Sequence, residues 1–189
     1  MQLLAPSKAP TVHLQDIDGK LIKVGDGRPT LLAFFRDAAC PFCNMQLYQL
    51  TQRYDKLSAM GLEIVAVFAS SPEEVKRFIL ARPRPFPVVA EPTAAAYEIY
   101  GIQQSFWKKI KAVLTRFPTL LKGLTVLGFA GSLKGLAGVN TTNIMPADFL
   151  IDEFGNIIVA YYGQDAGDHI PFERVEAFLA DYMLRNRKK

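Results

Sequence analysis

The chain has 189 residues, half of them hydrophobic, and it carries a formal net charge of +4 at pH 7. This length and composition suit a single globular domain over residues 1–189, and they exclude disordered, fibrous and disulfide-scaffold proteins. The N-terminal sequence MQLLAPSKAP lacks the basic start and apolar run of a secretory signal, and no apolar stretch is long enough to cross a bilayer. We therefore expect a cytoplasmic protein.

The first half of the chain alternates predicted strands and helices. Residues 12–22 alternate in polarity around an Asp-Gly dipeptide, which is typical of a β-hairpin. The continuous apolar runs over 30–35 (TLLAFF) and 62–69 (LEIVAVFA) predict strands that are buried on both faces. Between them, apolar residues at helical spacing predict a helix over 41–61.

The second half continues this alternation. A helix is expected after Ser71, because Pro72 suits the first helical position and Glu74 completes a capping box. The remaining predicted elements are a strand over 88–90, a helix over 92–100, two paired strands over 147–151 and 157–162, and a final helix over 172–185. This order predicts an α/β fold in which helices flank a central mixed sheet.

The only two cysteines, Cys40 and Cys43, form the motif C-P-F-C where the first apolar strand meets the first helix. If Cys40 caps this helix, its sulfur faces unpaired backbone N–H groups and the positive end of the helix dipole. Such cysteines have a pKa of about 3.5–7.5, so Cys40 is predicted to be the nucleophile. Pro41 fixes the first turn, and Cys43 lies one turn further along, where it can resolve a bond to Cys40 as a disulfide.

Two other readings of the cysteine pair remain open. The cysteines could be small buried hydrophobic residues at a helix start. They could also supply two of the four ligands of a metal, but the only histidines, His13 and His169, lie far away in the sequence. We therefore predict no metal and no cofactor.

Four stretches that include the cysteines resemble a known family. They are FFRDAACPFC, LEIVAVFASSPEEVKRF, PFPVVAEPTAAAYEIYG and PADFLIDEFGNIIVAYYG. Together they resemble the peroxiredoxin-like branch (alkyl hydroperoxide reductase/thiol-specific antioxidant) of the thioredoxin superfamily, from Ala9 to about Leu184 except within 102–145. The resemblance implies a thioredoxin-like fold with an N-terminal hairpin extension. It also implies a peroxide or disulfide substrate and a thiol reductant such as a thioredoxin or glutathione system.

The chain departs from the family's peroxidases around the cysteines. Those enzymes carry a proline seven residues before the attacking cysteine and a threonine or serine three before it, where this chain has Ala33 and Asp37. A carboxylate at 37 would oppose ionisation of the thiol unless a cation offsets it. Arg36 is adjacent, but strand alternation predicts that its side chain points to the opposite face. Arg36 and Asp37 are thus candidate modulators of the thiol pKa.

Disulfide-exchanging members of the superfamily suggest a further pair of site residues. These members place a cis-proline just before a strand, and Met145-Pro146 matches that context ahead of the strand over 147–151. We therefore expect a cis bond at Pro146 and a Met145 backbone that meets an extended substrate. Many thioredoxins also have a buried acid six residues before the first cysteine, where this chain has Phe34.

A basic insert over 102–145 interrupts the family pattern. It contains six basic residues and no acidic ones, and apolar residues recur at helical spacing over 105–127. Its helical part could pack on the domain or on a second copy in a homodimer, or bind an acidic partner. A membrane surface is less favoured, and no motif supports nucleic-acid binding.

The leading hypothesis is a thiol-dependent oxidoreductase that cycles the Cys40–Cys43 pair between dithiol and disulfide to reduce a peroxide or a disulfide. An alternative of a different class is a redox-sensing interaction module, in which the insert binds a partner and the dithiol only switches that binding.

Overall fold

The computed structural model describes residues 1–103, 122 and 143–186. Its strands are β1 (Ser7–Lys8), β2 (Leu14–Gln15), β3 (Leu21–Ile22), β4 (Thr30–Phe35), β5 (Glu63–Phe68), β6 (Val88–Ala90), β7 (Ala147–Ile151) and β8 (Asn156–Tyr162). Its helices are α1 (Pro41–Ala59), α2 (Pro72–Glu74), the π-helical turn η1 (Val75–Ile79), α3 (Ala95–Ile99) and α7 (Phe172–Asn186). The predicted insert helix over 105–127 and most of the insert lie outside the described residues.

The central sheet is mixed, as the sequence predicted. In the described part of the chain it has six strands in the order β1-β8-β7-β4-β5-β6. Strand β4 is in the middle and pairs parallel with β5 and antiparallel with β7, so that Ala33 lies between Ala66 and Asp148. Strand β1 was not predicted, because two residues are too few to show a pattern of alternation.

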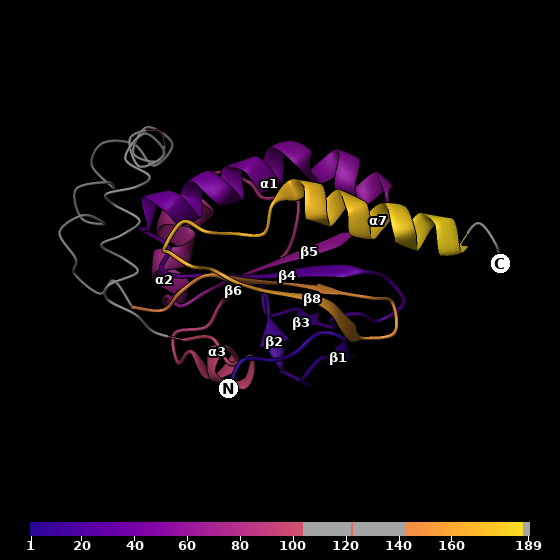
Figure 1. Cartoon of the computed structure of the whole chain (residues 1–189). Helices are drawn as coiled ribbons and strands as arrows, with labels where there is room; N and C mark the ends of the chain where they lie inside the picture. Colours follow the sequence, from indigo (N-terminus) through magenta and orange to yellow (C-terminus); the bar gives the residue numbers. More distant parts are fainter. Residues whose placement is uncertain (104–121, 123–142, 187–189) are drawn as a thin grey trace.

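Two layers of apolar side chains cover the sheet, one on each face. Figure 1 shows α1 and α7 side by side on one face, and α3 with the N-terminal segment on the other. Along β4, Ala33 and Phe35 belong to the core cluster under α1 and α7, whereas Phe34 belongs to the opposite cluster. Because both faces are buried, β4 reads as a continuous apolar run.

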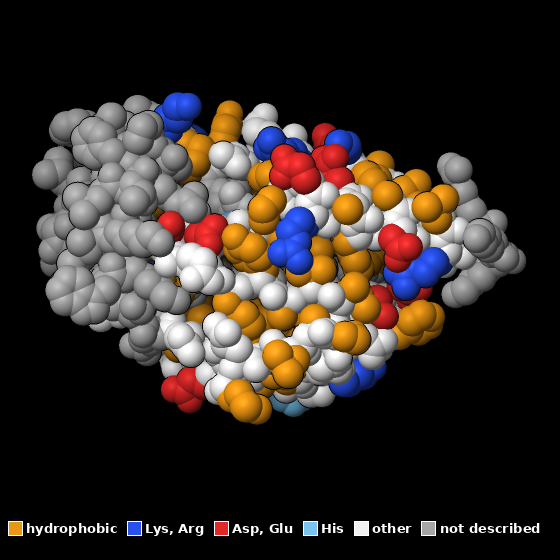
Figure 2. Space-filling model, in the orientation of Figure 1, with side chains coloured by type: hydrophobic (Ala, Val, Ile, Leu, Met, Phe, Trp, Pro, Cys, Tyr) orange, Lys and Arg blue, Asp and Glu red, His pale blue; other side chains and the backbone are white. Residues whose placement is uncertain are grey.

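The outer surface of the α1–α7 layer carries charged side chains of both signs (Figure 2). Lys56 of α1 and Glu176 of α7 form an ion pair of 2.7 Å between the two helices. Figure 2 shows acidic and basic side chains mixed with hydrophobic ones over this layer. No helix among the described residues is both long and apolar enough to span a membrane.

Two predicted helices are shorter than expected. The capping box at Ser71 is present, but α2 gives way after three residues to the π-helical turn η1. The helix predicted over 92–100 begins only at Ala95, since Ala94 has a φ of 57° in the left-handed region and cannot continue a right-handed helix.

The short strands β2 and β3 pair antiparallel at the position of the predicted hairpin. The carboxylate of Asp16 accepts hydrogen bonds from the backbone N–H groups of Asp18 and Lys20. Gly19 has a φ of 85°, which explains the glycine in this turn.

Candidate active site

Cys40 lies between the central strand and the longest described helix. It is the N-cap residue of α1, with an extended backbone (φ −68°, ψ 120°), and Pro41 occupies the first helical position. Its Sγ accepts a hydrogen bond from the backbone N–H of Cys43 at 3.5 Å. Both cysteines are unpaired and buried. The structure therefore brings Cys40, Pro41 and Cys43 together in the first turn of α1.

Arg36 is directed towards the dithiol, so the prediction that it points to the opposite face is wrong. Strand β4 ends at Phe35, and the alternation of side chains does not extend beyond it. The Arg36 guanidinium lies with Nη1 3.8 Å from Cys40 Sγ, and its Nε donates to the carbonyl of Ile144 at 2.9 Å. Arg36 therefore links Cys40 to the segment that leads into β7.

The two thiols have opposite tendencies to ionise. A hydrogen bond with the Cys43 side chain, supported by the positive charge of Arg36, outweighs burial and lowers the pKa of Cys40 to about 7. Burial raises the pKa of Cys43 well above its ordinary value. Although burial disfavours its charge, the adjacent cysteines raise the pKa of Arg36, so the cation persists. Near neutral pH, Cys40 is therefore the more readily ionised of the two cysteines, and Cys43 remains a thiol.

Asp37 is buried beside this pair and acts against it. Its negative charge raises the pKa of Cys40, as the sequence led us to expect.

The loop between β4 and α1 is held by Asn44, whose side-chain amide donates to the carbonyls of Ala38 at 2.7 Å and Cys40 at 3.1 Å. Sequence reasoning missed Asn44, because an asparagine within a helix gives no such signal.

The Met145–Pro146 peptide bond is trans, so the expected cis-proline is wrong. Among the described residues, the cis peptide bond is at Ala5–Pro6. Pro146 is buried just before β7, and its carbonyl accepts from the backbone N–H of Gly163 at 2.9 Å. A proline before a strand is compatible with either isomer, so context alone could not decide between them. The contact of Arg36 with Ile144 nevertheless connects this segment to Cys40.

A buried histidine–aspartate pair was not predicted as part of the site. The Nδ1 of His169 lies 3.1 Å from both carboxylate oxygens of Asp148, which also accepts from the backbone N–H of Ile170 at 2.7 Å. The rings of His169 and Phe35 pack 4.8 Å apart. The sequence contained one signal for this pair: Asp148 is an acidic residue within an otherwise apolar strand. In the structure it lies on β7 directly opposite Ala33 of β4.

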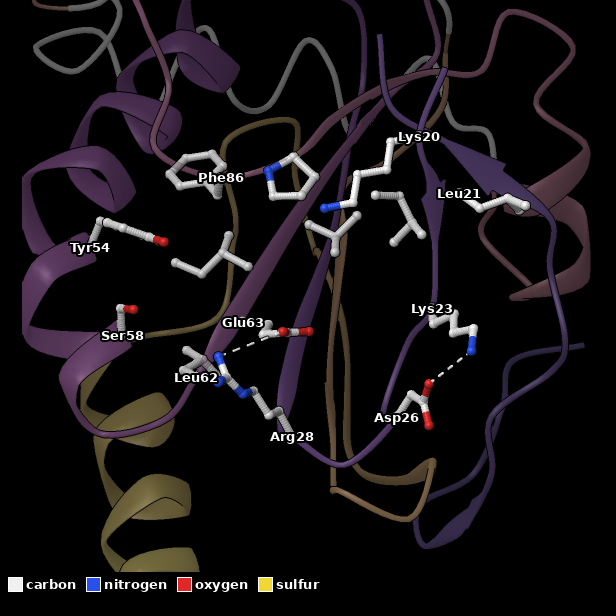
Figure 3. Close-up of a pocket in the computed structure, with 14 residues that line it drawn as sticks. Lys20, Leu21, Lys23, Asp26, Arg28, Tyr54, Ser58, Leu62, Glu63 and Phe86 are labelled. Carbon is white, nitrogen blue, oxygen red and sulfur yellow. Dashed lines mark ion pairs between the residues drawn. The ribbon is translucent and has the colours of Figure 1, made fainter. Parts of the chain in front are cut away.

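A large cavity of about 440 Å³ lies away from the cysteines. Figure 3 shows it between the β2–β3 hairpin and α1, and its lining contains none of the predicted site residues. Two ion pairs cross its wall, Arg28–Glu63 at 3.9 Å and Lys23–Asp26 at 3.3 Å. Within the described residues, no group of three or more His, Cys, Asp or Glu side chains could hold a metal.

Comparisons with known proteins identify a family and related chains. The model of the AhpC/TSA family matches residues 6–160. A Mycobacterium tuberculosis protein named as a peroxiredoxin (Rv2521) is 24% identical over 174 residues, which cover 89% of this chain and 91% of that protein. Peroxiredoxin Bcp of Escherichia coli K12 is 27% identical over 111 residues, which cover 57% of this chain and 71% of Bcp.

Solved structures show the same fold. Peroxidoxin BcpB of Mycobacterium tuberculosis superposes with a TM-score of 0.63 at 11% identity, covering 93% of this chain and 96% of that one. A PrxQ variant of Xylella fastidiosa superposes with a TM-score of 0.66 at 11% identity, covering 98% and 99%. The thioredoxin-like fold that the resemblance implied is therefore confirmed.

Proposed function

Because the chain belongs to the AhpC/TSA family and is a thiol-dependent oxidoreductase, we propose that it reduces a peroxide or a disulfide by cycling Cys40 and Cys43 between dithiol and disulfide. One observation carries the proposal. The sulfur of Cys40 accepts the N–H of Cys43 and lies 3.8 Å from the Arg36 guanidinium, so a thiolate at Cys40 is stabilised from two sides.

The reaction begins at Cys40. With a disulfide substrate, the thiolate attacks one sulfur and releases the other as a thiolate, which leaves a mixed disulfide on Cys40. With a hydroperoxide, the thiolate takes up the distal oxygen, which forms a sulfenic acid and releases an alcohol. Cys43 then attacks the Cys40 sulfur, and the second thiolate or water leaves. Both routes end in a Cys40–Cys43 disulfide, which a thiol reductant such as a thioredoxin or glutathione system restores with two electrons.

The residues around Cys40 favour a disulfide over a peroxide. Ala33 is fully buried in the core and offers no polar group to a peroxide. Asp37 places a negative charge near Cys40 where peroxidases of the family have a hydroxyl. Arg36, which lies beside Cys40, also donates to the carbonyl of Ile144, and the segment of Met145 and Pro146 follows there, so we assign this segment to substrate positioning.

The test compares both substrates on the same reduced protein. Reduced wild type, Cys40→Ser and Cys43→Ser are mixed in a stopped-flow instrument with hydrogen peroxide or with an oxidised dithiol peptide, and the products are read by mass spectrometry. We expect wild type to form an intramolecular disulfide faster with the peptide, Cys43→Ser to stop at a mixed disulfide, and Cys40→Ser to be inert. Oxidation by both substrates at the rate of a free thiol would contradict the proposal, and redox-dependent association without turnover would favour the sensing alternative.

A further inference from the structure

The end of β4 departs from the register that its pairing with β5 sets. The two strands pair in parallel without a shift, and the backbone N–H of Glu63 donates to the carbonyl of Pro29 at 2.9 Å. Continued in this register, the ladder would join the N–H of Ala69 to the carbonyl of Phe35. The N–H of Ala69 instead donates to the carbonyl of Arg36 at 2.8 Å. After Phe35 the chain of β4 has therefore gained one residue on β5, as in a β-bulge.

The hydroxyl of Tyr97 binds the carbonyl that the ladder leaves free. Tyr97 lies on α3 in the core cluster of the opposite face and is fully buried. Its hydroxyl donates to the carbonyl of Phe35 at 2.6 Å and lies 2.9 Å from the carbonyl of Val67. Burial raises the pKa of Tyr97 well above its ordinary value, although a hydrogen bond with the backbone of Ala69 opposes this shift, so the hydroxyl keeps its proton. The hydroxyl thus interacts with both groups that the continued ladder would join.

The extra residue changes the direction of the Arg36 side chain. Phe35 belongs to the core cluster that also contains Cys40, so regular alternation would turn Arg36 to the other face of the sheet. The guanidinium lies instead with Nη1 3.8 Å from Cys40 Sγ. A bulge re-aims the side chains beside it, which is one reason why bulges are common next to active sites.

We propose that the Tyr97 hydroxyl is a positioning group that directs Arg36 to the sulfur of Cys40. Its hydrogen bond to the carbonyl of Phe35 keeps the ladder from continuing in register, and this holds the guanidinium on the side of the cysteines. Without the hydroxyl, that carbonyl is free to accept from Ala69, and the guanidinium turns away from the sulfur. The inference rests on the proposed function, because it concerns the acidity of the sulfur that attacks the substrate.

Tyr97→Phe tests the inference, since it removes the hydroxyl and keeps the buried ring. The pKa of Cys40 is obtained from the rate of alkylation by iodoacetamide as a function of pH, and peptide mass spectrometry confirms that Cys40 is modified. We expect this pKa to rise by about 0.5–1 unit, because the cation is displaced and an adjacent opposite charge shifts a pKa by about 1–3 units. The rise lowers the alkylation rate at pH 6 by about 3- to 10-fold.

Tyr100→Phe is the matched control. Tyr100 is also fully buried, and its ring centroid lies 5.1 Å from that of Phe34, against 4.8 Å for Tyr97. Its hydroxyl donates to the carbonyl of Pro10 at 3.2 Å, in the N-terminal segment instead of β4. The pKa of Cys40 should therefore keep its wild-type value in this variant. Both variants retain the aromatic ring, and urea denaturation verifies that each is folded.

A double variant tests whether the effect passes through the cation. Arg36→Gln alone lacks the charge that the Tyr97 hydroxyl is proposed to direct. Adding Tyr97→Phe to Arg36→Gln should therefore leave the pKa of Cys40 where Arg36→Gln alone places it. A double-mutant cycle of this kind isolates the coupling between the two side chains.

Three results would overturn the inference. The first is a wild-type pKa of Cys40 in Tyr97→Phe. The second is an equal rise in Tyr100→Phe, which would reflect a general loosening of the core. The third is a rise of the same size in the Arg36→Gln background, which would show a route that does not involve the guanidinium. The proposed function is tested separately, by the intramolecular disulfide that wild type forms with the dithiol peptide, so its failure is distinguishable from a failure of this inference.

Discussion

Arg36 Nη1 lies 3.8 Å from the sulfur of Cys40, although strand alternation would have turned the two side chains apart. The guanidinium is buried and also donates to the carbonyl of Ile144, so its position is fixed from both ends. A buried cation that cannot move away from a thiol favours the ionised form of that thiol.

Replacing the cation should make Cys40 less acidic. In Arg36→Gln we expect the pKa of Cys40 to rise by about one unit, because a neighbouring opposite charge shifts a pKa by about 1–3 units. Arg36→Lys should have a smaller effect, since it keeps the charge but loses the planar contact with Ile144. The ultraviolet absorbance of the thiolate is measured as the pH is raised, and its midpoint gives the pKa of Cys40. An unchanged midpoint in Arg36→Gln would show that the hydrogen bonds from Cys43, and not the cation, set the acidity of Cys40.

Removing the charge of Asp37 should act in the opposite direction. This carboxylate raises the pKa of Cys40, so Asp37→Asn should lower it and increase the thiolate fraction at pH 6. The second-order rate of alkylation by iodoacetamide at pH 6 measures that fraction. Asp18→Asn, on an exposed turn, is the matched control and should leave the rate unchanged. A slower reaction of Asp37→Asn than of wild type would contradict the electrostatic argument.

The two cysteines should differ in their pH dependence. Cys40 has a pKa of about 7, so its alkylation rate should fall as the pH drops below 7 and level off above about 8. Cys43, whose pKa is raised well above the ordinary value, should remain unmodified across this range. Peptide mass spectrometry after brief alkylation at pH 7.5 locates the modification. Equal labelling of the two residues would be inconsistent with the assigned roles.

Asn44 should contribute to stability as well as to the site. Asn44→Ala removes the side-chain amide that donates to the carbonyl of Ala38, and an unsatisfied buried polar group costs about 1–3 kcal/mol. The carbonyl of Cys40 keeps the backbone N–H of residue 44 as a donor. Urea denaturation should show a loss of unfolding free energy of this size. Gln52→Ala, on the exposed face of α1, should change it by less than about 0.5 kcal/mol. Equal stability of the two variants would refute the assigned role of Asn44.

Phe34 should be a packing residue with no part in proton transfer. It is fully buried, with ring centroids 4.8 Å from Tyr97 and 5.1 Å from Tyr100 on the face of the sheet away from the cysteines. Phe34→Ala should lower the unfolding free energy by about 3–5 kcal/mol. The exposed Phe154→Ala is the control, with little expected change. A milder variant, Phe34→Leu, should be oxidised by the dithiol peptide at the wild-type rate.

The sequence predicted those elements whose pattern is local. The strand over 30–35 and the strands over 88–90 and 147–151 have the predicted bounds, because short apolar runs bounded by turn residues admit few alternatives. Helix α1 begins at Pro41 as predicted, since Pro41 favours a helix start. By contrast, hydrophobic periodicity could not predict the π-helical turn η1 or the left-handed backbone of Ala94.

The candidate site was predictable only where neighbours in sequence are neighbours in space. Cys40, Pro41 and Cys43 share one helical turn, and their arrangement follows from helix geometry. The pairing of His169 with Asp148 depends on a strand and a loop that are 21 residues apart, and the direction of Arg36 depends on where β4 stops. Long-range pairing and the last residue of a strand are both set by tertiary packing, which a single sequence does not display.

The short strand β1 has a consequence for handling the protein. It pairs with Asn156 and Ile157 of β8, and the backbone N–H of Leu3 donates to the hydroxyl of Tyr162 at the other end of that strand. Strand β1 thus covers one end of the outer edge of β8, whose backbone groups there would otherwise be open to pair with another molecule. Removing residues 1–8 would expose the outer edge of β8, and two molecules could then associate by pairing strands along that edge.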